Sequence, residues 1–196
     1  PQTARDLLRD ATTLGVAALH FVLTEKSDPN YAASTLWTTG EWRRHLLAGA
    51  AQAFDTHLPQ VTWGLPLADA LALLPSAIAL PAAKRITLDN YEAISPLAAL
   101  LPTDSTEAGS ASEWPAESPG PAGDRSEPGL TPIPNQSPMR VVPLLLLAFG
   151  PERGWGVKDR ALLRAQDFTH AHLGSRPLRL ETAVVAALAI AKAKCR

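Results

Sequence analysis

Two short polar segments carry the side chains best suited to chemistry in this sequence. The first, Asn135 to Pro143, runs from an amide through Arg140 into an apolar stretch, and the second, Thr169 to His172, ends in alternating histidines. Amide, guanidinium and imidazole groups can hold hydroxyls, phosphates or metal ions. Each also has a structural explanation: a turn for Asn135, a helix start for Arg140 and a helix end for His172.

An acidic pair near the N-terminus is a second candidate. Asp6 and Asp10 lie four residues apart, so a helix would place both carboxylates on one side for an acid/base or metal role. A solvated pair between Asp6 and Arg9 is the competing interpretation. Asp10 is the stronger candidate because Leu14 and Phe21 share its face.

Helical spacing dominates the elements that would position these groups. Alanine and leucine are abundant, β-branched alternation is scarce, and apolar residues recur at intervals of three and four. The sequence therefore predicts an all-α fold, an orthogonal or irregular multi-helix bundle. The expected helices cover 7–22, 38–53, 66–75, 88–101, 139–149, 158–169 and 175–196, the second beginning with a capping box between Thr38 and Glu41.

Residues 102–138 differ from the rest of the chain. They hold eight of the 18 prolines, and six carboxylates face Arg125 as the only cation. Such a segment buries too little apolar surface to offset the cost of ordering. We expect it to be a disordered acidic insertion within a single domain, whose N-terminal part is 1–101 and whose C-terminal part is 139–196.

Composition limits the partners and the compartment. The formal net charge of −1 gives no electrostatic footprint for nucleic acid, so we expect no nucleic-acid partner. One cysteine, Cys195, excludes an internal disulfide and a cysteine-based zinc site. No secretory signal or run of about 20 apolar residues is visible, and we expect a cytoplasmic protein without a membrane span.

Three tryptophans beside an arginine pair leave two interpretations open. Trp37, Trp42 and Trp63, with Arg43 and Arg44, suit a binding surface. Tryptophans in a helical chain rich in alanine and leucine also fill gaps in the core.

The order of the two polar segments resembles the ADP-ribosylglycohydrolase family. That family has an Asn-Gly-Ser-x-Met-Arg-[Val/Ile]-x-Pro segment before an apolar helix, then a Ser/Thr-x-Thr-His-x-His element and an alanine-rich helix. The corresponding residues here are 135–143, 167–172 and 181–193, about sixty residues in all. Gln136 stands where the family prefers glycine.

The resemblance implies an all-α enzyme with two Mg²⁺ ions that hydrolyses the glycosidic bond of ADP-ribosylated molecules. It implies substrate-binding roles for Asn135, Arg140, His170 and His172. It also implies metal-ligating roles for Asp10 and Thr12, because Arg9 to Thr12 matches the family's Thr-Asp-Asp-Thr run. Ala11 replaces the second carboxylate, and the family's C-terminal Asp-x-Asp-Thr segment is absent.

A single carboxylate would hold Mg²⁺ poorly. We therefore expect a protein like the ADP-ribosylglycohydrolases that hydrolyses, or as a pseudoenzyme only binds, ADP-ribose-type glycosides. A degenerate relative, a fragment of a longer enzyme and an accidental match at Asp10 remain open. If active, it would be a Mg²⁺-dependent glycosidic-bond hydrolase. The alternative is a non-catalytic helical scaffold that binds a protein partner through its acidic segment.

Overall fold

Parallel strands interleaved with helices make up the fold of this chain, which we describe from a computed structural model covering residues 2–74, 83–101 and 144–194. The helices are α1 (Gln2–Thr13), η1 (Pro29–Ala33), α2 (Thr35–Thr38), α3 (Trp42–Ala53), α4 (Leu67–Ala72), α5 (Leu97–Leu100), α6 (Val157–Ala165) and α7 (Leu180–Lys194). The strands are β1 (Ala18–Leu23), β2 (Gln60–Pro66), β3 (Lys84–Leu88), β4 (Ser95–Pro96), β5 (Leu145–Phe149) and β6 (Thr169–His172). The predicted all-α bundle is therefore wrong.

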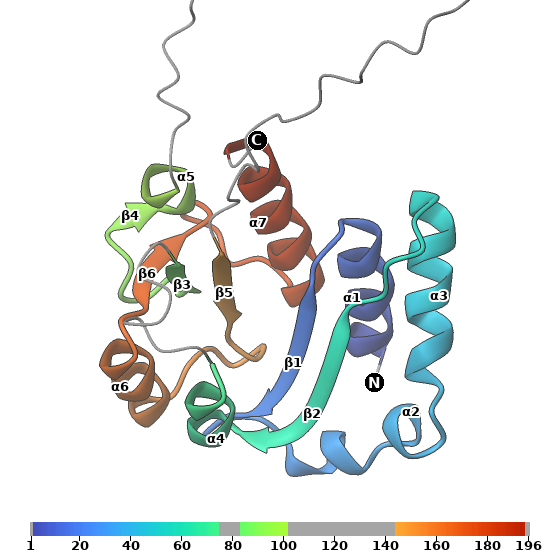
Figure 1. Cartoon of the computed structure of the whole chain (residues 1–196). Coiled ribbons are helices and arrows are strands. Elements are labelled where there is room, and N and C mark those ends of the chain that lie inside the picture. Colours follow the sequence, from blue (N-terminus) through green and yellow to red (C-terminus); the bar gives the residue numbers. More distant parts are fainter. Residues whose placement is uncertain (1, 75–82, 102–143, 195–196) are drawn as a thin grey trace, which may run out of the picture.

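Both sheets are parallel. β1 pairs with β2, and the second sheet has the order β4-β6-β3-β5, so β3 lies between strands from the other end of the chain. Leu88, the last residue of β3, is in register with Phe149 and Ala171. The carboxyl ends of β3, β5 and β6 therefore meet at one edge of the sheet (Figure 1).

Helices cover the strands from two sides, and β5 shows why. Leu145, Leu147 and Phe149 pack into a core cluster with α5 and α7, whereas Leu146 and Ala148 pack against α4 and α6. A strand buried on both faces needs a continuous apolar run rather than alternation. The same run also fits a buried helix, and this ambiguity explains why the helix predicted for residues 139–149 is wrong for their described part, 144–149.

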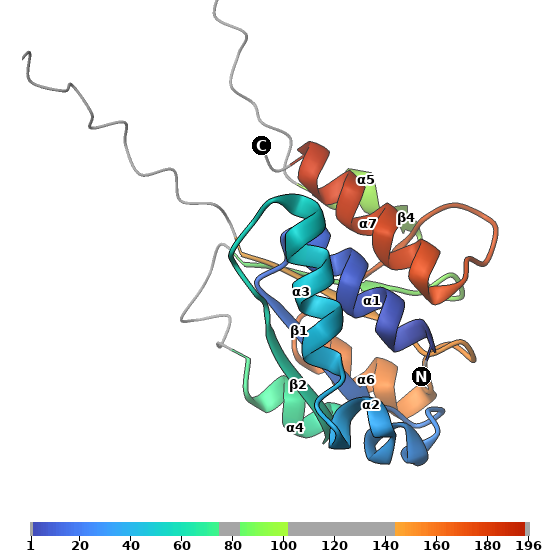
Figure 2. The same cartoon turned by 90° about the vertical axis from the view of Figure 1, so that its right-hand side faces the viewer.

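The third core cluster lies between β1, β2 and the N-terminal helices. Leu8, Leu36, Trp37 and Leu46 are buried there against the strand residues Leu19, Phe21 and Val61. Figure 2 shows α1, α3 and α7 together on the face turned towards the viewer. Gly49 lets α1 and α3 approach closely, because a Cβ at this position would overlap the carbonyl oxygen of Arg9.

The helix predictions were partly correct. α3 has the expected buried face of Leu46, Gly49 and Ala50, and α4 and α7 lie within their predicted ranges. α6 covers most of the predicted range 158–169 but begins at Val157 and ends at Ala165, and Thr169 belongs to β6. The capping box at Glu41 is wrong, since this residue makes no side-chain cap. The predicted helices at 7–22 and 88–101 are largely wrong, because β1 occupies part of the first and a loop and β4 part of the second. Residues 102–138 lie outside the described part.

Among the described residues, no helix is both long enough and apolar enough to cross a membrane.

Candidate functional site at the carboxyl ends of the parallel strands

Three loops follow the strands whose carboxyl ends meet. Residues 89–94 follow β3, residues 150–156 follow β5, and residues 173–179 follow β6. In open parallel sheets, ligands bind outside the carboxyl ends of the strands, where such loops supply main-chain and side-chain groups. We call these residues the three-loop site.

Hydrogen bonds tie the three loops together. Trp155, which is 1 % exposed, donates its indole N–H to the carbonyl oxygen of Leu88 at 3.0 Å. The amide of Asn90 donates to the carbonyl oxygen of Arg176 at 3.3 Å. A Cβ on Gly154 would lie 3.4 Å from the ring of Tyr91. The loops therefore form one connected surface although Asn90 and Arg176 are 86 positions apart in sequence.

Glycines open this surface to a ligand. Gly154 has φ +68° and Gly174 has φ +121°, conformations that other residues rarely adopt. Nothing lies within 4 Å of the position that a Cβ on Gly174 would occupy. Backbone N–H and C=O groups in the loop after β6 can thus be approached closely from outside.

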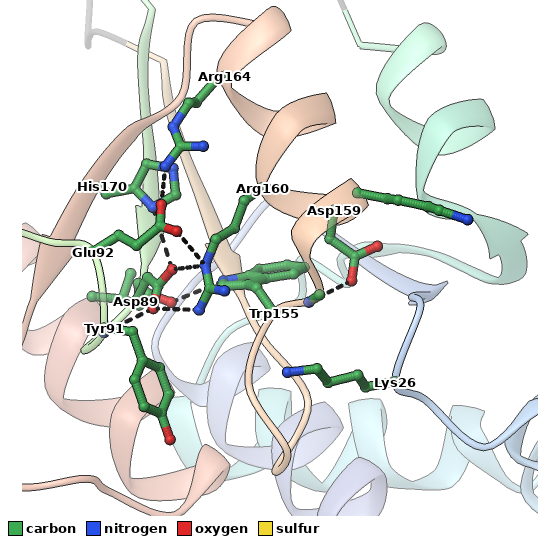
Figure 3. Close-up of polar contacts among 12 residues, drawn as sticks. Lys26, Asp89, Tyr91, Glu92, Trp155, Asp159, Arg160, Arg164 and His170 are labelled. Atoms are coloured by element: carbon green, nitrogen blue, oxygen red, sulfur yellow. Dashed lines mark hydrogen bonds and ion pairs between the residues drawn. The ribbon is translucent and has the colours of Figure 1, made fainter.

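A buried ion pair fixes the first loop to α6 (Figure 3). The Arg160 guanidinium donates to both oxygens of Asp89, at 2.5 and 3.1 Å, and the Asp89 side chain is only 1 % exposed. The backbone N–H of Tyr91 donates to the same carboxylate at 2.9 Å. Burial opposes ionisation of Asp89, but these hydrogen bonds and the Arg160 charge outweigh it and lower the pKa of the carboxyl.

His170 extends this ion-pair network from β6. Its Nδ1 lies 3.5 Å from Asp89 Oδ2, and neither ring nitrogen makes a hydrogen bond with the described residues. Burial and the charge of Arg164 lower the pKa of His170, despite the opposing effect of Asp89. The neutral imidazole is therefore the favoured form.

One oxygen each of Asp89 and Glu92 and one nitrogen of His170 lie within 4.8 Å of one another, a spacing that a metal ion could bridge. However, Arg160 pairs with Asp89, and Arg164 pairs with Glu92. Two guanidinium groups already neutralise both carboxylates. We therefore interpret the cluster as an ion-pair network that positions the loop between β3 and β4.

The loop after β1 is attached to the same edge. The Asp159 carboxylate accepts hydrogen bonds from the backbone N–H groups of Gly156, at 3.0 Å, and of Glu25, at 3.1 and 3.2 Å. Lys26 reaches the carbonyl oxygen of Arg153 at 3.3 Å. A Cβ at position 156 would overlap the Glu25 side chain, so a larger residue there requires Glu25 to move.

The residues predicted from the sequence are not assembled into one site. Asp10 and Thr12 lie on α1, which packs on α3 and α7 on the other side of the molecule from α6 (Figure 1). Thr12 donates its hydroxyl to the carbonyl oxygen of Leu8 at 2.6 Å, and Asp10 accepts from Arg9 at 2.8 Å. Asp10 also lines a shallow hollow with Glu181 and other residues of α7.

Of the predicted substrate-binding residues, Asn135 and Arg140 lie outside the described residues. His170 belongs to the ion-pair network, and His172 accepts a hydrogen bond from the backbone N–H of Gly174 at 3.1 Å. Both histidines therefore lie at the three-loop site, but on a strand rather than at a helix end.

Sequence reasoning missed Asp89, Trp155 and Arg160. A signal for two of them was present: Asp89 directly follows the β-branched pair in Arg85 to Leu88, and Trp155 lies among glycines after an apolar run. A strand followed by a glycine-bearing loop and a helix is a common ligand-binding unit. Nothing local indicated that Arg160 would meet Asp89, which is 71 residues away in sequence.

Comparison with known proteins gives a consistent result. A family model described as an RNA methyltransferase domain matches residues 1–104 and 132–192. The ribosomal RNA small subunit methyltransferase E of Treponema pallidum is 27 % identical over 190 residues, covering 97 % of this chain and 57 % of its own length. This chain thus spans less than two thirds of that relative.

Two solved structures share the fold. The ribosomal RNA small subunit methyltransferase E of Neisseria gonorrhoeae, bound to S-adenosyl methionine, superposes with a TM-score of 0.63 at 20 % identity, over 98 % of this chain and 61 % of that one. A probable rRNA-methyltransferase from Porphyromonas gingivalis gives 0.66 at 15 % identity, over 99 % and 63 %.

These findings correct the functional expectations. Membership of the ADP-ribosylglycohydrolase family, with hydrolysis or binding of ADP-ribose and with Mg²⁺ as cofactor, is wrong. The absence of a nucleic-acid partner was also wrongly predicted, because a net charge averages over acidic and basic surfaces. The non-catalytic scaffold is not favoured either. The motif resemblance misled because its segments are short, and the second one is a strand.

Proposed function

This chain belongs to the RNA methyltransferase domain family, and we propose that it transfers a methyl group from S-adenosylmethionine to an RNA. Two observations support the cofactor: the convergence of the three loops, and the fold shared with a protein whose structure holds S-adenosyl methionine. The convergence carries the proposal, because it places main-chain donors and acceptors where parallel sheets bind ligands.

The residues present fit such a cofactor. S-adenosylmethionine offers an adenine edge, two ribose hydroxyls, a carboxylate and an ammonium group, all of which main-chain N–H and C=O groups can recognise. The loops 150–156 and 173–179 would hold it, since Gly174 keeps its backbone open to close approach and Gly154 adopts a positive φ that shapes the neighbouring loop. Asp89 and Glu92 are engaged by arginines, so they would act by positioning the loop 89–94.

When bound, the cofactor supplies an electrophilic methyl group on a sulfonium centre. A nucleophilic atom of the RNA forms the new bond to this methyl carbon as the carbon–sulfur bond breaks, and a nitrogen nucleophile also loses its proton. The chain contributes orientation: Trp155 and the Asp89–Arg160 pair hold two of the loops in a fixed relation. His170 is a positioning residue of this network.

We further propose that the substrate is ribosomal RNA, as the names of the relatives suggest, and that the protein acts in the cytoplasm. We also propose that the parts before and after residues 102–138 form one domain. Pairing of β3 with β5 and packing of α1 on α7 support this organisation.

Cofactor binding gives the first test. S-adenosylmethionine should raise the melting temperature and bind in calorimetry, whereas ADP-ribose with Mg²⁺ should do neither. With tritiated cofactor, ribosomal RNA lacking its modifications should acquire label. If S-adenosylmethionine neither binds nor labels any RNA, the proposal is refuted.

A pair of glycine variants locates the site. Gly174→Ala should weaken binding of S-adenosylmethionine by roughly tenfold or more, equivalent to about 1.4 kcal/mol. Gly15→Ala is the matched control, because Gly15 also has a positive φ and open space at its Cβ but lies between α1 and β1. Equal affinities in the two variants would place the cofactor elsewhere.

A further inference from the structure

A second surface carries aromatic and cationic groups that the three-loop site does not use. Trp37 of α2 and Trp63 of β2 are stacked, with ring centroids 5.2 Å apart and an interplanar angle of 9°. Trp42, the first residue of α3, has its ring centroid 5.7 Å from that of Trp63, at an interplanar angle of 52°. We call Trp42, Arg43 and Trp63 the tryptophan platform.

Of these three tryptophans, only Trp37 is buried in the hydrophobic core. Trp37 is 6 % exposed and packs with Leu8, Leu36 and Leu46. Trp63 covers Trp37 from outside but is itself 36 % exposed. It lies on β2, which pairs with β1 alone among the described strands. About a third of the Trp63 residue thus remains open to solvent.

Two arginines directly follow Trp42 in sequence. The Arg43 guanidinium carbon lies 4.5 Å from the centroid of the Trp42 ring, and Arg43 makes no ion pair with a described carboxylate. The Arg44 side chain is 78 % exposed and forms an ion pair with Glu41 at 3.6 Å.

Glu41 adds little negative potential to this surface. Arg5 donates a hydrogen bond to its carboxylate at 2.9 Å, and a ring nitrogen of His45 lies 3.3 Å away. The Arg5 and His45 hydrogen bonds lower the pKa of Glu41 to about 2. Arg5, Arg44 and His45 thus share this single carboxylate, and with Arg43 beside them the surface around the platform is cationic.

A partly exposed aromatic ring near Arg43 and the exposed Arg44 matches the chemistry of single-stranded nucleic acid. Bases stack on aromatic rings and on guanidinium planes, and the backbone phosphates pair with the cations. A second copy of this chain would instead bring like charges together. We propose that the tryptophan platform binds a single-stranded segment of the RNA, with a base stacked on Trp63 and a phosphate paired with Arg43.

This inference rests on the proposed function in that RNA is the substrate. The platform lies on β2 and α3, on the opposite side of the molecule from α6 and β6 (Figure 1). It would therefore hold a part of the RNA away from the reacting nucleotide. Loss of the platform should raise the KM for RNA and leave kcat at saturating RNA unchanged.

Binding of a fluorescent oligouridylate about ten nucleotides long tests the proposal by anisotropy. Trp63→Leu should weaken binding about five- to a hundred-fold, the range expected for one stacked base, whereas Trp63→Phe should retain most of the affinity. Arg43→Gln should weaken binding and reduce its salt dependence by about one phosphate contact. An abasic analogue should bind the parent and Trp63→Leu equally, because it has no base to stack.

Two matched controls separate the platform from general surface effects. Phe54→Ala removes an aromatic ring that is 98 % exposed just after the carboxyl end of α3, and Lys84→Gln removes an exposed cation at the amino end of β3. Both should bind the oligomer like the parent. In the parent protein, an oligomer with 5-bromouridine should cross-link under ultraviolet light to the peptides containing Trp42 or Trp63, a readout that does not depend on how any variant folds.

The outcomes distinguish this inference from the proposed function. Cofactor-dependent methylation with an unchanged KM in Trp63→Leu, or cross-links only at other peptides, overturns the platform and leaves the methyltransferase intact. RNA binding that depends on Trp63, without any binding of S-adenosylmethionine, overturns the methyltransferase and leaves the platform. A change in oligomeric mass in Trp63→Leu with unchanged RNA binding identifies the surface as a protein contact and also overturns the platform.

Discussion

Arg160 and Asp89 form a bidentate pair between α6 and the end of β3, with guanidinium-to-carboxylate distances of 2.5 and 3.1 Å. The Asp89 side chain is 1 % exposed and that of Arg160 is 11 % exposed. Such a pair contributes specificity of position more than net stability, because both charges lose hydration on burial. Its role here is to fix the loop that follows β3.

Removing one partner of the Asp89–Arg160 pair should reveal the free-energy cost of leaving the other charge buried and unpaired. Arg160→Ala leaves the Asp89 carboxylate buried without its cation, and we expect the free energy of unfolding to fall by about 3–5 kcal/mol in urea titrations. Arg164→Gln is the control, since the Arg164 side chain is 53 % exposed, and a change within about 1 kcal/mol is expected. Similar losses of stability in both variants would contradict the conclusion that breaking the buried Asp89–Arg160 pair costs more than breaking an exposed one.

The His170 environment predicts a dependence of stability on pH. The pKa of His170 is lowered in the folded state from its ordinary value of 6.5, by burial first and by Arg164 second. As the pH falls through about 6.5, the unfolded chain binds a proton that the folded chain resists, so the free energy of unfolding decreases on acidification. His170→Gln should flatten this slope between about pH 7 and pH 5. His20→Gln, at an exposed position, should retain it; equal slopes in all three proteins would refute the assignment.

The Trp155 indole should be required to hold two loops together. Trp155→Phe leaves the carbonyl oxygen of Leu88 without its 3.0 Å donor, at a cost of about 1–3 kcal/mol in stability. Amide hydrogen exchange should accelerate in residues 89–94 and 150–156, and binding of S-adenosylmethionine should weaken. Unchanged exchange in both loops would show that they are held by other contacts.

The close approach of α1 and α3 predicts an intolerant glycine. A Cβ at position 49 would overlap the carbonyl oxygen of Arg9 on the neighbouring helix, so Gly49→Ala should destabilise the protein by about 1–3 kcal/mol or more despite its better helix propensity. Ala51→Gly, at an exposed position of the same helix, should cost only about 0.5–1 kcal/mol. Thermal melts of both variants give the comparison; a stabilised Gly49→Ala would contradict the close approach.

Helix α3 was predictable because its buried positions repeat with helical spacing over a long segment. Leu46, Gly49 and Ala50 form the face that packs inward, as expected from their spacing. Much of α7 was predictable for the same reason, although it begins at Leu180 rather than near Ser175. Such patterns involve only residues close in sequence, so they can be recognised without knowing which other elements pack against the helix.

Strand β5 was not predictable in this way. Its residues Leu145 to Phe149 are apolar throughout, and only the presence of helices on both faces makes this run a strand. A short run of this kind has no periodicity that separates a buried strand from a buried helix. Because this segment was predicted to be a helix, no parallel sheet was predicted from the sequence. The sheet edge at which the three loops meet was therefore not predicted either.

The sequence by itself determined helix α3 and much of α7, the distinct composition of residues 102–138 and the presence of histidines at 170 and 172. Only the tertiary structure decided that His170 meets Asp89 and Arg160, and that Trp155 reaches Leu88. The spacing of apolar residues indicates which face of a single helix or strand is buried. This site, in contrast, forms only when β3 pairs with strands from the other end of the chain. No local pattern encodes that pairing, because its energy comes from the burial and hydrogen bonds of segments far apart in sequence.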